Sequence, residues 1–313
     1  MKKYVLVVGL IFQQTISLAC DVCGCYTGVL PYENKNSIAI YSRYRAFKND
    51  YYVGKNDWFP DGSFYKTEHG VSSTEKVSGY EVFRALEIRG RLFFKPKWEL
   101  NFNLPYIKSV SSEGLKKEMI NGVGDFSLNI YRHFASENCN KQCQNRLILG
   151  GGFKLPTGRN DFLTSNGQRA ELYNQPGTGS LDYNLMANYA LGYKQAGFSA
   201  STNFRYNSTN SFNEKLCSII NFSSMLFYKI KVSEDWMVVP SVIGTFEKTR
   251  GVRIGNNLQI GTSMQLMMMG AGWQLIYKRI ALDSQLLLPF DDPKSINSQR
   301  STIRIVIGFI YNI

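Results

Sequence analysis

The chain has 313 residues, a formal net charge of +12, six cysteines and two histidines, and 44% of its residues are hydrophobic. Its mean hydropathy is slightly negative. Beyond residue 20 no apolar run approaches the roughly 20 residues that a membrane-spanning helix needs. These features exclude a membrane protein built from helices and leave two classes, a secreted all-β protein and an outer-membrane β-barrel.

The first 19 residues have the layout of a secretory signal peptide. Lys2 and Lys3 precede an apolar run from Tyr4 to Phe12, and small residues follow up to position 19. Cleavage there would make Cys20 the first mature residue. A lipoprotein signal, with an acylated Cys20, is the alternative. Ser17 stands where such a signal usually has leucine, which argues against lipidation.

Residues 20–36 form the second predicted segment, a periplasmic stretch that begins "CDVCGC". The C-x-x-C-x-C spacing of Cys20, Cys23 and Cys25 suits a soft metal ion, because thiolates favour Cu(I) and Zn(II). An oxidising periplasm would instead join two of these thiols in a disulfide. Lipid attachment at Cys20 is the third alternative. The sequence leaves all three open.

From residue 37 to 313, apolar and polar residues alternate with a period of two, which predicts β-strands with two unlike faces. Most of the segments reach the roughly 9–11 residues that a tilted strand needs to cross a bilayer, whereas strands of soluble proteins average about 5–6. Their even number suits a bacterial barrel. The 12 segments are 37–48, 79–94, 98–107, 122–134, 146–156, 180–193, 196–208, 217–230, 236–248, 258–277, 279–289 and 300–313.

The stretch from Leu181 to Asn207 shows the pattern best. Odd positions are apolar or aromatic as far as Tyr193, and after Lys194-Gln195 the even positions from Phe198 to Tyr206 take over. We expect these apolar faces to meet lipid. In the segment 258–277 the apolar parity changes at residues 270–272, where two glycines predict a β-bulge.

The connections between the strands alternate in length, as they do in outer-membrane barrels. Long loops are predicted at 49–78, 108–121, 157–179, 209–216, 249–257 and 290–299, and tight turns lie between them. Both chain ends and the tight turns would face the periplasm. Cys139 and Cys143 share one of these turns, so we expect a local disulfide there, with Cys217 left over and buried or at the rim.

Charged residues on the polar faces of the strands are candidates for lining a lumen. Such charges screen solutes by sign and size. The alternative is that they pair with one another and fill a narrow barrel. The predicted lumen-lining residues are Glu87, Arg89, Arg91, Glu99, Asp125, Asp182, Arg205 and Arg304, with Glu81, Lys154 and Glu247 as further candidates.

Three blocks of the chain resemble a known family. They are "NGVGDFSLNIYRHF" (121–134), "GGFKLPTGRND" (151–161) and "QPGTGSLDYN" (175–184). They are similar to blocks of the outer-membrane transporters linked to the meta-pathway of phenol degradation, over roughly residues 80–313. That family is itself similar to long-chain fatty-acid and aromatic-hydrocarbon channels. The resemblance implies a barrel that transports small molecules.

The sequence therefore predicts an all-β, up-and-down outer-membrane barrel of about 12 strands that acts as a passive channel, with loops 49–78 and 157–179 as gates. The alternatives are a barrel that presents the cysteine cluster for metal handling, and a structural or adhesion barrel. We expect no enzymatic activity, because no serine is suggested to lie beside His69 or His133. Expected partners are membrane lipids, a small solute and the outer-membrane assembly machinery, to which the last strand, alternating up to Ile313, is suited. No nucleic-acid motif is present.

Overall fold

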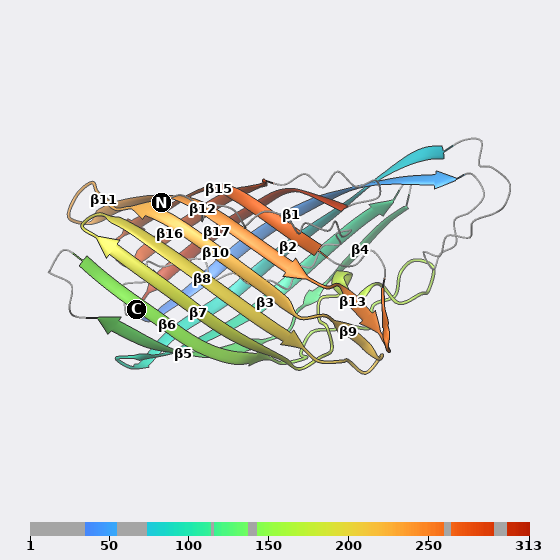
Figure 1. The fold of residues 1–313 in the computed structure, drawn as a ribbon, viewed down its shortest axis with the longest axis horizontal. Helices are drawn as coiled ribbons and strands as arrows, with labels where there is room; N and C mark the ends of the chain where they lie inside the picture. The colour runs from blue at the N-terminus through green and yellow to red at the C-terminus, as the bar shows by residue number, and fades with distance from the viewer. Residues whose placement is uncertain (1–34, 55–73, 114–115, 137–142, 260–263, 291–298) are drawn as a thin grey trace, which may run out of the picture.

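The computed structural model describes residues 35–54, 74–113, 116–136, 143–259, 264–290 and 299–313. Figure 1 shows these residues as a single twisted barrel wall. The signal sequence, the cysteine cluster, most of loop 49–78 and most of loop 290–299 lie outside the described residues. The predicted division into segments 1–19, 20–36 and 37–313 therefore stays a prediction, although the first strand begins at Ser37.

Long antiparallel strands form a closed ring in which each strand pairs with its neighbours along the chain, and the last strand pairs with the first. Two shorter strands, β4 and β5, both pair with β3 and act as two sections of one barrel strand. The ring thus has the 12 predicted strands. The bounds are β1 Ser37–Gly54, β2 Thr74–Lys95, β3 Trp98–Glu113, β4 Lys116–Val123, β5 Ser127–Ser136, β6 Cys143–Lys154, β7 Asp182–Tyr193, β8 Ala196–Asn207, β10 Ile219–Tyr228, β12 Trp236–Thr249, β15 Met264–Tyr277, β16 Ile280–Pro289 and β17 Gln299–Asn312.

Smaller elements lie in the connections between the barrel strands. A three-stranded sheet consists of β9 Glu214–Leu216, β13 Val252–Ile254 and β14 Asn257–Leu258, and β11 Ile230–Lys231 pairs with β12. A 3-10 turn, η1 Leu172–Asn174, lies in the connection between β6 and β7. No helix in the described part of the chain is long and apolar enough to span a membrane.

The predicted alternation of faces is confirmed, and its sense is inverted relative to a soluble protein. Leu185 on β7 is 63% exposed on the outer face, and Tyr183 and Tyr193 share that face. Asp182 and Asn188, on the same strand, are buried inside the barrel. This distribution suits a barrel whose outer face meets hydrocarbon and whose interior is polar.

The two ends of the barrel differ. Three of the predicted tight turns, at 96–97, 194–195 and 278–279, are two-residue connections, and Lys194 and Lys278 adopt the left-handed backbone that such hairpins require. The first and last strands meet at the same end, where the Ile313 amide donates to the Asn36 carbonyl at 2.8 Å. We call this the turn end and the opposite one the loop end.

The prediction of a β-bulge at residues 270–272 is wrong. β15 pairs with β12 and β16 without any shift of register. Leu266 and Met268 are buried inside the barrel against Ile243 and Leu287, so apolar residues in this segment do not all face outward. Register shifts lie elsewhere, in β17 beside Thr302 where it pairs with β1, and in β2 between Phe93 and Lys95 where it pairs with β3.

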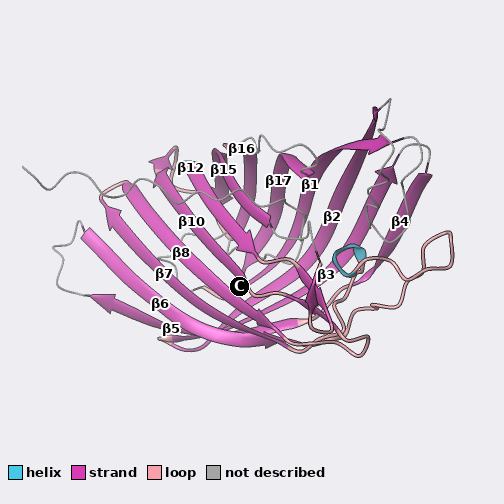
Figure 2. Ribbon diagram, turned by 45° about the vertical axis from the view of Figure 1, so that its right-hand side comes forward, coloured by secondary structure: helices cyan, strands magenta, loops and turns pink. Residues whose placement is uncertain are grey.

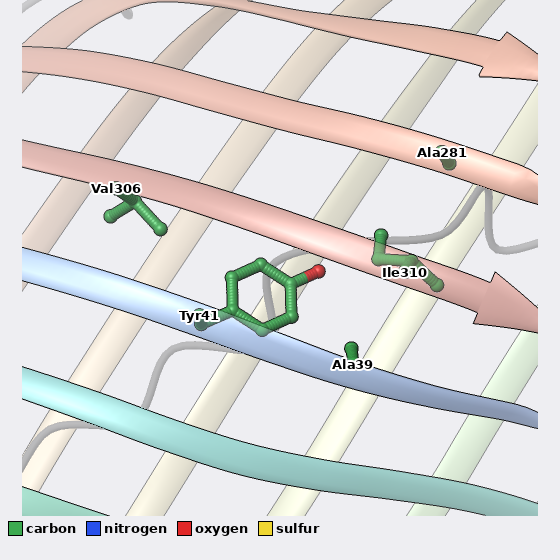
Figure 3. Packing of buried hydrophobic residues seen from close by; sticks show 5 residues of the cluster. All are labelled: Ala39, Tyr41, Ala281, Val306 and Ile310. Atoms are coloured by element: carbon green, nitrogen blue, oxygen red, sulfur yellow. The ribbon is translucent and has the colours of Figure 1, made fainter.

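One side of the interior is filled by apolar side chains. Ala39, Tyr41, Ala281, Val306 and Ile310 form a buried cluster on β1, β16 and β17, shown in Figure 3. Gly308 is the cross-strand partner of Tyr41, and a Cβ at Gly308 would lie 2.2 Å from the tyrosine ring. The glycine therefore lets the aromatic ring lie flat against the neighbouring strand, a device known to support glycines in sheets.

The alternation of faces predicts unequal effects of adding a charge on either side of the wall. Tyr189→Arg places a cation on the outer face, where it should reduce the free energy of unfolding from liposomes by about 2–4 kcal/mol. Ser201→Arg places the same charge on the inward, half-buried face of β8 and should cost much less. Urea titration of barrels folded into liposomes measures both. Equal losses would contradict the lipid-facing assignment.

Candidate functional site: the lumen and the segment across its mouth

Many of the charged side chains inside the barrel are gathered in clusters, each built around a buried carboxylate. Glu87 on β2 forms ion pairs with Arg43 on β1 and Arg89 on β2, and Arg89 Nε donates to Glu87 Oε2 at 2.7 Å. The guanidinium of Arg89 also lies 4.4 Å from the centre of the Tyr41 ring. The cluster therefore couples two strands through one carboxylate.

A second cluster joins strands that are not neighbours in the ring. Glu247 on β12 binds Arg45 on β1 at 3.0 Å and Arg304 on β17 at 2.7 Å. Strands β15 and β16 lie between β12 and β17. Because Glu247 reaches past two strands, this cluster braces the wall from inside.

The third cluster lies near the 96–97 turn, at the turn end. Glu99 Oε2 lies 2.8 Å from His133 Nε2 and 3.2 Å from Arg91 Nε. Arg146 approaches the other ring nitrogen of His133 at 3.5 Å. The imidazole is thus held between a carboxylate and a guanidinium, which explains how a histidine is accommodated in the interior.

All eight predicted lumen-lining residues point inward, and most are buried in these clusters or in the loop-end network described below. Whether they line a path for a solute stays a prediction. Arg43 and Arg45 were not among the predicted lumen-lining residues, although they lie inside the barrel. The alternation of β1 could have identified both arginines, because its odd positions from Ala39 through Arg45 share the inward face of Tyr41.

The connection between β6 and β7, residues 155–181, folds over the loop end of the barrel (Figure 2). Leu172 of η1 packs with Leu216, Ile219 and Val252 on the β9, β10 and β13 side. Tyr173 contacts this cluster and also Phe47 and Phe83 on β1 and β2.

The anchors of this segment lie on opposite sides of the mouth. On the side of β3, Ser109 Oγ donates to Asn174 Oδ1 at 2.9 Å. In the ring, β1 and β10 are separated by β12, β15, β16 and β17 one way and by the remaining barrel strands the other way. The short turn η1 therefore spans the mouth from wall to wall.

A buried polar network, which we call the clasp, fixes both ends of this segment. Asp125, just before β5, accepts hydrogen bonds from the backbone amides of Gly158 and Thr178, both at 2.9 Å. Lys154 at the end of β6 pairs with Asp125 and, at 2.9 Å, with Asp182 at the start of β7. Breaking such a buried pair costs about 3–5 kcal/mol, so the clasp holds the segment firmly.

Three glycines allow the clasp to close. A Cβ at Gly177 would lie 2.4 Å from the Gly158 carbonyl oxygen, and one at Gly158 would lie 2.8 Å from the Gly124 backbone. Nearby, Thr157 Oγ1 accepts from the Phe126 amide at 2.8 Å. The backbones approach more closely than any side chain permits, which explains why glycine occupies all three positions.

The clasp unites the three sequence blocks on which the family resemblance rests. Asp125 comes from block 121–134, Gly158 from block 151–161, and Thr178 and Asp182 from block 175–184. The sequence identified the blocks as strand ends and turns. Their convergence could not be read from it, because it depends on the pairing of β5, β6 and β7.

The predicted metal and disulfide sites are largely beyond what the structure describes. Cys20, Cys23, Cys25 and Cys139 lie outside the described residues, so the metal site and the disulfide with Cys143 stay predictions. Cys217 is buried near the loop end, as expected. Within the described ranges no group of three or more His, Cys, Asp or Glu side chains is placed to hold a metal ion.

No protein-family model matches the chain, and no curated protein matches it significantly. Among solved structures, an outer-membrane channel from Pseudomonas putida F1 is similar over 91% of this chain and 100% of its own, with 14% identity and a TM-score of 0.53. The NanC porin aligns over 86% and 100% of the two chains, with 9% identity and a TM-score of 0.39. The first of these similarities shows that the chain has the fold of an outer-membrane β-barrel, and that fold suggests the outer membrane as its location.

The clasp predicts that Asp125→Ala releases the connection 155–181 without unfolding the barrel. In the folded protein, trypsin should then cut faster at Arg159 and Arg169, while the barrel keeps its resistance to heat in detergent. Asp235→Ala is the matched control. Asp235 pairs with Lys278 at the surface of the turn end and takes no part in the clasp. Unchanged cleavage in Asp125→Ala would contradict this role.

Proposed function

We propose that the protein is an outer-membrane channel through which small hydrophilic molecules pass by diffusion. The single observation that carries the proposal is the polar interior of a closed barrel, crossed at one mouth by an ordered segment. Porins are water-filled barrels of this kind, and their lumen residues tune selectivity.

The half-buried inward residues support a path along one side of the lumen. The apolar cluster around Tyr41 fills the side of β1, β16 and β17. Inward amides and hydroxyls that keep partial exposure lie on β3, β5 and β8; they are Asn101, Asn103, Asn129, Ser201 and Asn203. Solutes would pass along this polar side, because its amide and hydroxyl groups can replace part of the hydration shell of a solute.

In this proposal the segment 155–181 is the main barrier to passage. Its η1 turn spans the loop end, and the clasp holds both of its ends. The loop end would face the cell exterior, because both ends of the barrel domain and the tight turns lie at the other end. The family resemblance implies transport of small molecules, and the charged interior favours hydrophilic ones among them.

Removing the side chains that span the mouth should widen the path. The double variant Leu172→Ala, Tyr173→Ala should raise the single-channel conductance in planar bilayers, because these residues reach both sides of the mouth. Leu163→Ala is the matched control, since Leu163 is exposed in the same connection. A barrel that stays closed to ions in every variant would contradict the channel proposal.

The orientation makes a separate prediction. A cysteine introduced at Gln195, in a tight turn, should not react with a membrane-impermeant maleimide on intact cells beyond the wild-type level. A cysteine introduced at Ser165, in the 155–181 connection, should react. Both should react once the outer membrane is opened. Labelling at position 195 on intact cells would reverse the assignment of the two ends.

A further inference from the structure

We propose that the lumen selects for small anions, with Arg43 and Arg89 as the residues that determine this selectivity. The inference rests on the proposed channel function and names the class of solute. The first observation is that, in the interior ion pairs, the carboxylates lie closer to the barrel wall than the cations do. The carboxylates of Glu87, Glu99 and Glu247 are almost completely buried, whereas the cations that bind them are more exposed.

The contrast is greatest around Glu87. Its side chain is 0% exposed, whereas those of Arg43 and Arg89 are 12% and 15% exposed. The short glutamate stays against the wall, and the longer arginines bind it while facing the lumen. A passing solute therefore meets guanidinium groups before it meets the carboxylate.

Around two of the buried carboxylates, the ratio of cations to carboxylates points the same way. Glu87 is bound by two arginines, and so is Glu247. An opposing charge near Arg89 is Asp283 on β16, which is close enough to interact with it electrostatically. Asp283 is itself buried and accepts a hydrogen bond from Gln285 at 3.2 Å, so its charge lies farther from the accessible lumen than the guanidinium groups.

The position of the two arginines suits a selectivity site. Arg89 lies at the border of the two sides, because its guanidinium lies over the Tyr41 ring and its cross-strand partner Asn103 is one of the half-buried residues on the polar side. An anion on that side would exchange part of its hydration for guanidinium and amide hydrogen bonds. Arginine side chains arranged around a pore are a known basis of anion selectivity. Guanidinium groups also match the geometry of carboxylate oxygens.

The test is the reversal potential of the purified barrel in planar bilayers under a potassium chloride gradient, repeated with potassium acetate. The wild type should pass chloride and acetate in preference to potassium. Arg89→Gln should lower the anion-to-cation permeability ratio, because it removes one of the two positive charges that face the lumen. The variant should still fold, because Arg43 remains paired with Glu87. Arg89→Lys should retain most of the ratio. Glu87→Gln should raise it.

Arg84→Gln is the matched control, because Arg84 lies on the same strand but faces outward, over the Tyr44 ring. Resistance to heat in detergent shows which variants fold. If Glu87→Gln does not fold, the permeability ratios of Arg89→Gln, Arg89→Lys and Arg84→Gln decide whether Arg89 determines the selectivity.

The outcomes separate the two proposals. A barrel that conducts but prefers potassium, or whose selectivity shifts no more in Arg89→Gln than in Arg84→Gln, would overturn the anion inference and leave the channel intact. A barrel that conducts no ions, even in the Leu172, Tyr173 double variant, would contradict the channel and the inference with it.

Discussion

The burial of carboxylates inside a closed barrel is the constraint on which the rest of this structure depends. In the low-dielectric interior an unpaired charge is very costly, so each buried carboxylate needs a cation within reach. Glu87, Glu99 and Glu247 each meet this need through residues of neighbouring or facing strands. The strand register is fixed as a result, because a slip by one residue would turn these charges toward lipid.

The same constraint shapes the loop end. The connection 155–181 brings backbone polar groups over the mouth, and such groups also need partners. Asp125 accepts from the Gly158 and Thr178 amides, and Lys154 balances its charge. Glycines at 124, 158 and 177 allow the backbones to meet. Fixing this connection thus depends on one carboxylate and on three positions without side chains.

Much of the fold could be predicted from the sequence, because a membrane barrel shows its period-two pattern over long strands. Alternation located 12 strands, three of the tight turns and the inward parity of residues such as Asp182 and Arg205. It failed at 264–268, where Leu266 and Met268 face inward, because an apolar residue suits either lipid or a packed patch of the interior. The shift beside Thr302 left no signal that alternation could locate.

The site was harder to predict, since it depends on residues far apart in the chain. Asp125, Lys154 and Asp182 lie at strand ends that only the ring brings together, and Arg45 meets Glu247 across 202 positions of sequence. Parity assigns a residue to a face but not to a partner. The η1 turn gave no sequence signal either, because its anchors, such as Phe47 and Ile219, read as ordinary strand residues.

Stability and permeability make opposite demands on this interior. Filling the lumen with apolar side chains, as the cluster around Tyr41 does on one side, stabilises the wall but leaves nothing to replace the hydration of a solute. Lining it with unpaired charges would attract solutes but destabilise the barrel. Pairing a wall-bound carboxylate with two longer cations satisfies both demands, because the carboxylate is neutralised while guanidinium groups still face the lumen. In the proposed channel, a path beside Arg43 and Arg89 would therefore let solutes pass without loss of barrel stability.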